Sequence, residues 1–376
     1  MRIGIEVQRI FRRKKHGMEV VGMELVKAIQ QMDRSNEYVL FARKDEHTEG
    51  LAPTPNFKFQ TLRSVTYADW EQVVLPRAVK RMEIDLLHCT SNTGPVSSPV
   101  PMILTLHDII YLENLNFKGS NYQNFGNLYR RIVVPKLVEK SDLVITVSEF
   151  EKRLIRERFQ VPEEKVKVLY NGVHERFHVK HTAKELQAFR KSLNLPSEFI
   201  LFLGNLAPKK NTINVIKAYM HYCKQQKSPL PIVLLDYSRD QVAYVLKQQN
   251  SLECLANFHF PGYISPLEMP LAYQNASLFL YPSLRESFGM PILESMASGI
   301  PVITSNTSSM PEVAGSAALY VDPFSYYDIS RGISAVLNNN TLRHQLIESG
   351  YQRSMKFNWN NVAGELIRIY KQYGKG

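Results

Sequence analysis

Residues 282–294 read PSLRESFGMPILE, a stretch that follows an apolar run and enters a segment with helical spacing. Pro291 suits the first turn of that helix, where no amide hydrogen is needed for helix bonding. The free amides and positive dipole end of a helix start can bind an anion, and Gly289 lets the backbone approach it closely. Glu286 lies before the helix and Glu294 about one turn into it. The stretch therefore predicts a strand, an anion-binding turn and a helix flanked by two carboxylates.

Two interpretations of these carboxylates remain open from spacing alone. Carboxylates beside a bound diphosphate can accept hydrogen bonds from sugar hydroxyls. Alternatively, Glu294 is a solvated helix residue and Glu286 only complements the helix dipole.

The same order of strand and helix repeats along the chain. Apolar runs predict strands at 3–7, 38–42, 86–88, 102–106, 143–147 and 166–169 and, after a restart at Asn171-Gly172, at 200–203, 232–235, 256–260, 278–281, 302–304 and 319–321. Helical spacing is typical of 20–31, 127–140 and 359–373. This alternation predicts an α/β fold with two parallel, doubly wound sheets. The polar stretch 174–191 is a candidate for the linker between them.

Composition limits the classes of protein that fit. The chain has 376 residues, 44% hydrophobic and 22% charged, which is enough for two globular domains. No apolar run approaches the ~20 residues of a membrane span, and the start reads as a strand, so we expect a cytoplasmic protein; peripheral contact with the inner membrane face is the alternative. The net charge of +11 is spread over both halves, which suits phosphorylated substrates better than nucleic acid. Cys89, Cys223 and Cys254 predict reduced thiols and no metal cluster.

A second loop suited to phosphate binding has the sequence GNLAPKKN, residues 204–211, and again lies after a predicted strand and before a helix. Lys210 offers a compact ammonium that can neutralise a departing pyrophosphate. Taken alone, one lysine is more often a solvated side chain.

These blocks together resemble the family-four (group 1) retaining glycosyltransferases. The spacing of Glu286 and Glu294, with Phe288-Gly289 and Pro291 between them, reproduces the family's glutamate signature. The resemblance continues through 147–150, 170–173, 297–303, 310–313 and 317–323. The residues of these motifs are most similar to those of bacterial mannosyltransferase-like members of the family.

The resemblance implies a GT-B fold, with two Rossmann-like doubly wound domains facing each other across a cleft. Residues 1–172 would bind the acceptor, residues 173–355 the nucleotide-sugar donor, and residues 356–376 would form a helix crossing back to the first domain. The implied reaction moves a hexose, with mannose favoured, from GDP-mannose or a UDP-sugar to a glycan or lipid-linked acceptor. It proceeds with retention and without a metal or other cofactor, in polysaccharide or lipopolysaccharide biosynthesis.

The family also implies roles for single residues. Lys210, helped by Lys209 and the amides near Gly289, would hold the donor phosphates, Glu286 the sugar hydroxyls and Glu294 the ribose. The catalytic candidates are His107, Glu286 and Lys210. The donor-binding candidates are Gly17, Gly204, Asn205, Lys209, Lys210, Glu286, Ser287, Phe288, Gly289 and Glu294. The sequence departs from the common pattern at Asn205, where many members carry arginine, and at Glu19, where many carry a second glycine.

The acceptor half offers fewer signals. His107-Asp108 follows a predicted strand, where the family places a histidine near the transferred sugar; a metal hydrolase would need further ligands with recognisable spacing. Arg12, Arg13, Lys14 and Lys15, in the loop that also holds Gly17, could attract an anionic acceptor or be a solvated loop. The helix at 127–140 is expected to pack on the sheet, with a membrane surface as the alternative.

Rival functions share the fold. A nucleotide-sugar epimerase or a phosphorylase is the alternative within enzymes, and the family context of the two glutamates argues against both. A non-catalytic nucleotide-sugar-binding protein is the alternative outside them, suggested only by Asn205 and Glu19. A covalent glycosyl-enzyme is an open retaining route for which the sequence identifies no nucleophile.

Overall fold

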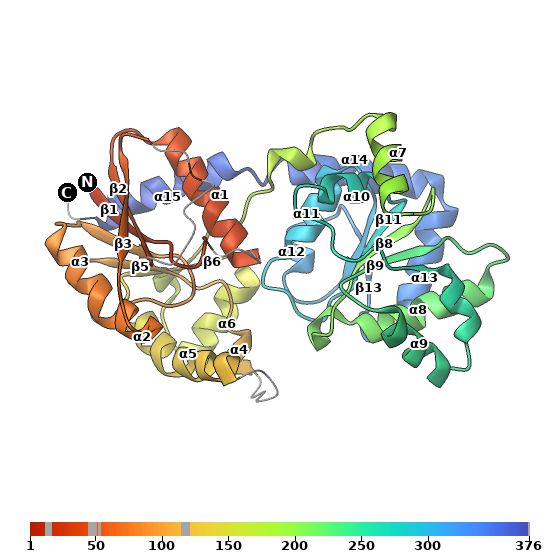
Figure 1. Ribbon diagram of the computed structural model, residues 1–376, viewed down its shortest axis with the longest axis horizontal. Helices are drawn as coiled ribbons and strands as arrows, with labels where there is room; N and C mark the ends of the chain where they lie inside the picture. The colour runs from red at the N-terminus through yellow and green to blue at the C-terminus, as the bar shows by residue number, and fades with distance from the viewer. Residues whose placement is uncertain (12–16, 44–50, 52–53, 114–120, 375–376) are drawn as a thin grey trace. The chain divides into compact units, whose positions relative to one another are not determined.

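A computed structural model describes residues 1–11, 17–43, 51, 54–113 and 121–374 (Figure 1). The chain divides into two compact units, Met1–Gly172 with Asn358–Gly376, and Val173–Phe357. The basic cluster at residues 12–15 lies outside the described residues.

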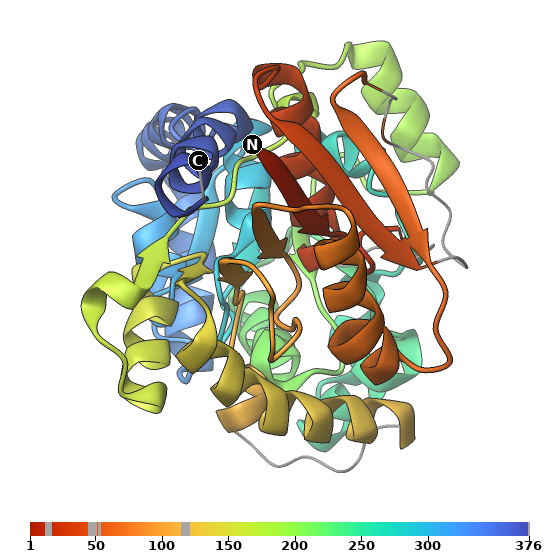
Figure 2. The same cartoon turned by 90° about the vertical axis from the view of Figure 1, so that its left-hand side faces the viewer.

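The first unit is built on one parallel sheet. Its strands are β1 (Arg2–Glu6), β2 (Glu37–Arg43), β3 (Phe57–Leu62), β4 (Leu86–Cys89), β5 (Met102–Thr105), β6 (Leu143–Thr146) and β7 (Val166–Val168), and its helices are α1 (Gly17–Met32), α2 (Tyr67–Asp69), α3 (Leu75–Arg81), α4 (Ile110–Glu113), α5 (Asn121–Lys140), α6 (Glu149–Phe159) and α15 (Trp359–Tyr373). A π-helical turn, Trp70–Val74, joins α2 to α3, and a 3-10 turn, Glu163–Lys165, precedes β7. The strand order is β3-β2-β1-β4-β5-β6-β7, and β1 to β3 run side by side in Figure 2.

Alternate strand residues bury opposite faces of this sheet, as strand geometry requires. On one face, Ile3 and Ile145 join a core with α1 and α15. On the other, Phe41 and Leu104 join a core with α3, α5 and α6. The C-terminal helix is thus part of the first unit's core. On α5, Val134 is fully buried, so this helix packs on the sheet as expected.

The second unit repeats the plan. Its strands are β8 (Ile200–Leu203), β9 (Ile232–Leu235), β10 (Phe258–His259), β11 (Leu278–Tyr281), β12 (Val302–Ser305) and β13 (Leu319–Val321), its helices are α7 (Ala183–Ser192), α8 (Thr212–Gln225), α9 (Arg239–Gln248), α10 (Met269–Asn275), α11 (Met290–Ala297), α12 (Met310–Ala314), α13 (Tyr326–Asn338) and α14 (Asn340–Ser354), and its 3-10 turns are Glu175–Phe177, Pro208–Lys210 and Leu252–Asn257. The order β10-β9-β8-β11-β12-β13 is again parallel. Phe202 and Leu280 pack on α8, α9 and α13. Phe279 packs on the other face, with its ring 5.2 Å from that of Tyr273 on α10.

Three sequence expectations need correction. The strand β3 was not predicted, because its burial pattern is mixed rather than apolar. The stretch 174–191 is not a linker: it belongs to the second unit and holds α7, whose start is closed by a capping box between Thr182 and Glu185. The strand predicted at 256–260 shortens to β10, since a 3-10 turn occupies the residues before it.

Gly172 is fixed by close packing against Trp359. A β-carbon at Gly172 would lie 2.6 Å from the backbone nitrogen of Trp359 and 2.7 Å from its Cγ. We expect Gly172→Ala to destabilise the first unit by about 1–3 kcal/mol, because the backbone contact cannot yield. Both tryptophans of the chain, Trp70 and Trp359, belong to this unit. Urea unfolding followed by tryptophan fluorescence therefore reports it selectively.

The matched control is Gly126→Ala on α5, where an added β-carbon meets nothing within 4 Å. A helical glycine costs roughly 0.5–1 kcal/mol relative to alanine, so this variant should be slightly stabilised. Equal unfolding midpoints for the two variants would contradict the packing argument.

Candidate functional site

The second sheet has a topological switch point between β8 and β11. Chain order runs outward from β8 to β9 and β10 on one side, and from β11 to β12 and β13 on the other. Loops leaving the carboxyl ends of two such strands diverge, and open α/β sheets bind ligands in the crevice between them. The loop 204–211 follows β8, and the loop 282–289 follows β11. Both sequence-predicted phosphate elements therefore lie at one switch point.

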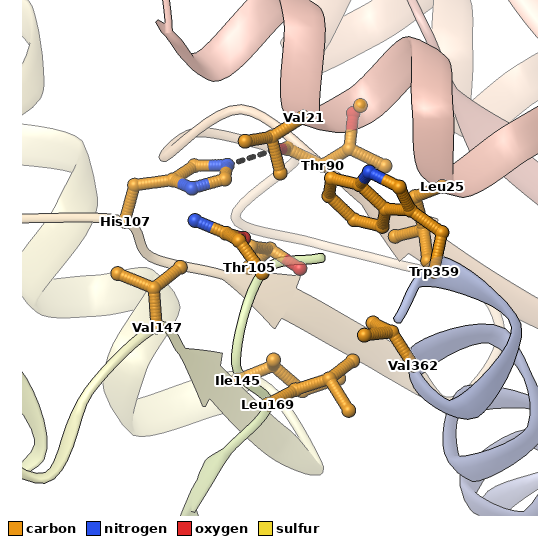
Figure 3. Close-up of a pocket in the computed structure, with 12 residues that line it drawn as sticks. Val21, Leu25, Thr90, Thr105, His107, Ile145, Val147, Leu169, Trp359 and Val362 are labelled. Atoms are coloured by element: carbon orange, nitrogen blue, oxygen red, sulfur yellow. Dashed lines mark hydrogen bonds between the residues drawn. The ribbon is translucent and has the colours of Figure 1, made fainter. Parts of the chain in front are cut away.

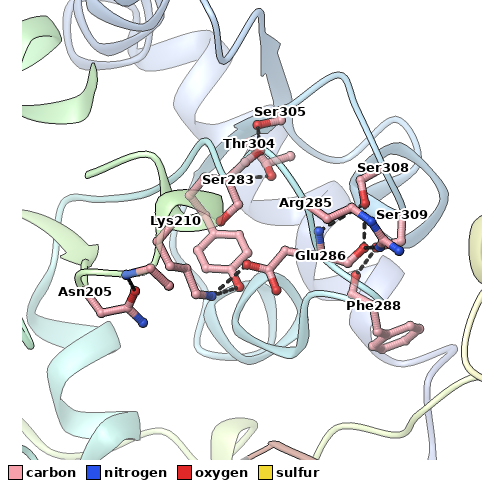
Figure 4. Close-up of polar contacts among 12 residues, drawn as sticks. Asn205, Lys210, Ser283, Arg285, Glu286, Phe288, Thr304, Ser305, Ser308 and Ser309 are labelled. Carbon is pink, nitrogen blue, oxygen red and sulfur yellow. Dashed lines mark hydrogen bonds and ion pairs between the residues drawn. The ribbon is translucent and has the colours of Figure 1, made fainter. Parts of the chain in front are cut away.

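Lys210 and Glu286, one from each loop, form an ion pair (Figure 4). Lys210 Nζ donates to Glu286 Oε1 and to Tyr281 Oη, each at 2.7 Å. Glu286 is only 8% exposed. An ammonium has three donors, so one remains for a ligand. Sequence reasoning missed Tyr281, because the last residue of a buried strand reads as core.

The charge of Glu286 depends on the lysines. Burial alone would raise the pKa of its carboxyl group, but the charges of Lys210 and Lys209 and the hydrogen bonds from Lys210 and Tyr281 lower that pKa below its ordinary value. Glu286 is therefore a carboxylate at neutral pH and acts as a hydrogen-bond acceptor.

Hydroxyl groups from the turn between β12 and α12 hold the backbone of the loop 282–289. Ser308 Oγ donates to Glu286 O at 2.5 Å, and Ser309 Oγ donates to the carbonyls of Glu286 and Phe288 at 2.9 Å. Asn211 Nδ2 donates to Pro282 O at 2.9 Å. These side chains fix the orientation of the loop. The sequence had suggested no such role for them, although Asn211 lies in the motif 204–211.

The helix start predicted at Gly289 is present. Gly289 has φ +101°, a left-handed conformation that favours glycine, and α11 begins at the next residue with Pro291 in its first turn. Phe288 is buried with its ring 5.9 Å from that of Phe357, so its side chain packs in the unit's interior. Ser287 is half-buried in the same loop. The predicted donor contacts of this segment thus fall to backbone atoms and Ser287.

Glu294 lies on α11 and is half-buried, not solvated. Tyr273 Oη donates to its Oε2 at 3.1 Å. Burial raises the pKa of Glu294 to about 7, against the opposing effects of the Tyr273 hydrogen bond and the Arg176 charge. The side chain therefore titrates near neutral pH, which is common for functional carboxyl groups.

The loop after β8 uses its polar side chains mainly for its own shape. Asn205 Oδ1 accepts from Ala207 N at 2.9 Å, which leaves its amide group as the side chain's donor. Gly204 is closely packed, since a β-carbon would lie 2.8 Å from Leu234 Cδ1 and 2.9 Å from Phe202 Cε1. Lys209 is half-buried next to Lys210 and acts electrostatically on Glu286. Lys209 thus adds a positive charge beside Glu286.

In the first unit, His107 lines a small pocket behind the carboxyl end of β5 (Figure 3). The pocket encloses about 20 Å³, room for a single water, between apolar side chains and the polar residues Thr90, Thr105 and Asn171. Trp359 of α15 also lines it. His107 N donates to Asn92 Oδ1 at 2.6 Å, which fixes the turn after the strand.

The protonation of His107 follows from its contacts. Nε2 lies 2.9 Å from Thr90 O, and because a carbonyl only accepts, Nε2 carries the proton. Burial lowers the pKa of His107, despite the opposing effects of Thr90 and Asp108. The imidazole is therefore neutral at pH 7 and offers Nδ1 as an acceptor.

Gly17 is exposed at the first position of α1, so it begins the helix rather than lying in a loop as expected.

Across the described ranges, no helix is long and apolar enough to cross a membrane. Nor does any group of three or more His, Cys, Asp or Glu side chains in the described part of the chain lie close enough together to hold a metal ion.

Solved structures share this architecture. The sucrose-phosphate synthase of Thermosynechococcus elongatus superposes with a TM-score of 0.74 over 99% of this chain and 98% of that protein, at 17% identity. Anabaena HepE, solved in complex with UDP, gives a TM-score of 0.75 over 99% of each chain, also at 17% identity. This likeness defines the class: the chain has the GT-B fold of glycosyltransferases, as the sequence predicted.

Sequence comparison gives the family. A model of the group 1 glycosyl transferases matches residues 183–353, and a model of glycosyltransferase family 4 matches residues 16–177. The chain belongs to this family of group 1, family 4 glycosyltransferases, which confirms the resemblance found from its motifs.

Curated relatives share part of their length with this chain. O-antigen chain mannosyltransferase B of Escherichia coli is 29% identical over 62% of this chain and 61% of its own length. O-antigen chain mannosyltransferase RfbU of Salmonella typhimurium is 30% identical over 58% of this chain and 56% of its own. The matches thus span less than two thirds of these relatives.

Proposed function

We propose that this protein is a hexosyltransferase that moves a sugar, with mannose favoured, from a nucleotide-sugar donor to a glycan or lipid-linked acceptor, with retention at the anomeric carbon and without a metal. The second unit binds the donor and the first unit the acceptor, in polysaccharide or lipopolysaccharide biosynthesis. The observation that carries the proposal is the ion pair of Lys210 and Glu286 at the switch point of the second sheet, with Glu294 on the adjoining helix.

Each donor-side residue has chemistry that suits a part of the donor. Lys210 uses its third hydrogen to bind the diphosphate, with Lys209 adding charge, so that negative charge is stabilised as the nucleoside diphosphate leaves. Amides at the start of α11 bind the same group. Glu286, ionised and held by its neighbours, accepts from the sugar hydroxyls, and Glu294 accepts from the ribose.

His107 acts from the first unit. Its neutral imidazole, with Nδ1 as the acceptor, receives a hydrogen bond from a sugar hydroxyl or from the attacking acceptor hydroxyl. For a lipid-linked acceptor, contact with the cytoplasmic membrane face is part of the proposal. Leu128 and Ile132 on α5 support it, since both are 54% exposed.

The choice of donor rests on relatives. Two relatives are named as mannosyltransferases, which favours mannose as the transferred sugar. A structurally similar protein was solved with UDP, so a UDP-sugar is the alternative donor to GDP-mannose. Thermal shift with GDP, UDP, GDP-mannose and UDP-glucose in EDTA separates these donors, because a ligand that binds only the folded state raises its apparent stability. We expect a shift of several degrees for one nucleotide class only.

Two variants test the donor site, Lys210→Ala and Glu294→Ala. Their control is Lys247→Ala, on the exposed face of α9. The first two should abolish the shift and the third should keep it. If well-folded protein shows no shift with any of the four nucleotides, the donor site proposed here is wrong.

A further inference from the structure

Glu294 differs from Glu286 in how its charge is maintained. Two lysines lower the pKa of Glu286, whereas burial raises the pKa of Glu294 to about 7. Tyr273 Oη donates to the Glu294 carboxyl group at 3.1 Å. The ribose hydroxyls require the ionised form, because only a carboxylate accepts from both of them. A role of Glu294 in donor binding therefore calls for a cation that favours loss of the proton.

Arg176 is connected to Glu294 by a series of packed side chains. It lies in the 3-10 turn Glu175–Phe177, which packs against α11, the helix that carries Glu294. Its guanidinium lies 5.4 Å from the centre of the Phe177 ring. The Phe177 ring lies 6.0 Å from that of Tyr273, edge to face, and Tyr273 is the residue that donates to Glu294. This packing brings the positive charge of Arg176 within electrostatic reach of the Glu294 carboxyl group.

The guanidinium of Arg176 is poorly used as a structural anchor. The residue is half-buried, and its Nε is buried without a hydrogen-bond partner among the described residues. A buried donor without a partner costs free energy, so its position calls for another explanation. A charge that is partly removed from water acts more strongly on its neighbours than one in bulk solvent. The charge of Arg176 therefore explains its place beside α11 better than its hydrogen bonds do.

The other ionisable groups around α11 cannot supply this charge. Burial raises the pKa of Tyr273 on α10 and of Tyr281 on β11 well above the ordinary value, so both remain neutral. Arg353 on α14 donates to the carbonyls of Glu312 and Val313 on α12. Glu312 itself is an acid. Among the described residues, Arg176 is thus the cation whose charge favours ionisation of Glu294.

We propose that Arg176 is the positioning residue that keeps Glu294 in its charged form, able to accept from the donor ribose. This rests on the proposed function, which assigns Glu294 to the ribose. Arg176 acts through Glu294 and sets the pH above which the donor binds tightly. It lies in the stretch 174–191, for which the sequence suggested a linker.

The first test is urea unfolding of the nucleotide-free protein at pH 4.5 and pH 8.5, followed by circular dichroism. Arg176→Met raises the pKa of Glu294 further, so more of the stability of the protonated form is lost as the pH rises. The variant should therefore lose more of its unfolding midpoint, relative to wild type, at pH 8.5 than at pH 4.5. In a Glu294→Gln background the loss should be equal at the two pH values. A purely structural role of Arg176 would give equal losses in both backgrounds.

The second test is calorimetric titration with GDP and with UDP at pH 7 and pH 8.5. Arg176→Met should bind the nucleotide about threefold to fivefold more weakly than wild type at pH 7, because less Glu294 is ionised, and nearly as tightly at pH 8.5. Arg176→Lys restores the charge and should recover most of the lost affinity. The matched control is Arg239→Met at the exposed start of α9, which should bind as wild type does at both pH values.

A second variant keeps the tests decisive if Arg176→Met folds poorly. Arg176→Gln removes the charge but keeps a hydrogen-bond donor, and the same results are expected of it. The inference is overturned if affinity falls equally at pH 7 and pH 8.5, or if the pH-dependent loss of stability persists in Glu294→Gln.

The two tests also separate this inference from the proposed function. If wild type binds a nucleotide but removing the charge of Arg176 has no pH-dependent effect, the role of Arg176 is wrong and the donor site stands. If Arg176 and Glu294 are coupled in unfolding but wild type binds neither GDP nor UDP, the donor site is wrong and the coupling stands.

Discussion

Lys210→Ala should lower the rate of sugar transfer by about 10²–10³-fold, the loss typical of removing one donor that stabilises a developing oxyanion. Two effects combine. The departing diphosphate loses the third donor of the ammonium, and Glu286, which is 8% exposed, loses the counter-charge that keeps its pKa low. Steady-state kinetics with the donor identified by thermal shift would measure the loss.

The second effect can be separated from the first. An unpaired buried carboxylate destabilises the fold, whereas removing both partners of a buried pair costs much less. Lys210→Ala combined with Glu286→Gln should therefore recover unfolding stability relative to Lys210→Ala alone, without recovering transfer. Lys247→Ala should match wild type in both measurements. Recovery of transfer in the double variant would mean that the ion pair is structural and that the phosphates bind elsewhere.

Much of the fold could be predicted because its strands are buried on both faces. Ile200–Leu203 and Leu278–Tyr281 read as uninterrupted apolar runs, which is typical of parallel sheets. Phe57–Leu62 escaped prediction because three of its side chains are exposed, as suits a strand at the sheet edge. The stretch 174–191 was wrongly predicted as a linker because it is polar. Its polar residues instead cap α7 and form the exposed side of that helix.

The candidate site was predictable only where a local motif carries it. Lys210, Glu286 and Glu294 lie in contiguous motifs, and the structure brings Lys210 and Glu286 together across 76 positions of sequence. Tyr281 and Ser309 act through hydrogen bonds to these loops, and nothing in the local sequence marks such contacts. Tyr129 on α5 donates to Glu71 across 58 positions of sequence, and no spacing of residues along the chain could predict that contact.

Glu294→Gln should change how stability depends on pH. The carboxyl group has an ordinary pKa of 4.5 and a pKa of about 7 in the folded protein. The folded state therefore holds the proton more tightly, and the stability that this provides is complete below pH 4.5 and is lost as the pH rises through 7. The difference corresponds to at most roughly 3 kcal/mol. Glu294→Gln should match wild type near pH 4.5 and be the more stable protein at pH 8.5, as measured by denaturant unfolding without nucleotide.

The same group should make nucleotide binding depend on pH in the opposite sense. Only the ionised carboxylate accepts from both ribose hydroxyls, so binding expels the proton and the affinity of wild type should rise by up to tenfold per unit between about pH 5.5 and 7. Calorimetry in two buffers of different ionisation enthalpy would detect the released proton at pH 6.5. The titration of the nucleotide phosphates is common to wild type and Glu294→Gln, so the difference between them isolates Glu294. If nucleotide affinity depends on pH in the same way in wild type and Glu294→Gln, Glu294 does not bind the ribose. If Glu294→Gln is more stable than wild type without nucleotide but binds nucleotide more weakly at pH 8, the carboxylate lowers the stability of the fold and is needed for donor binding.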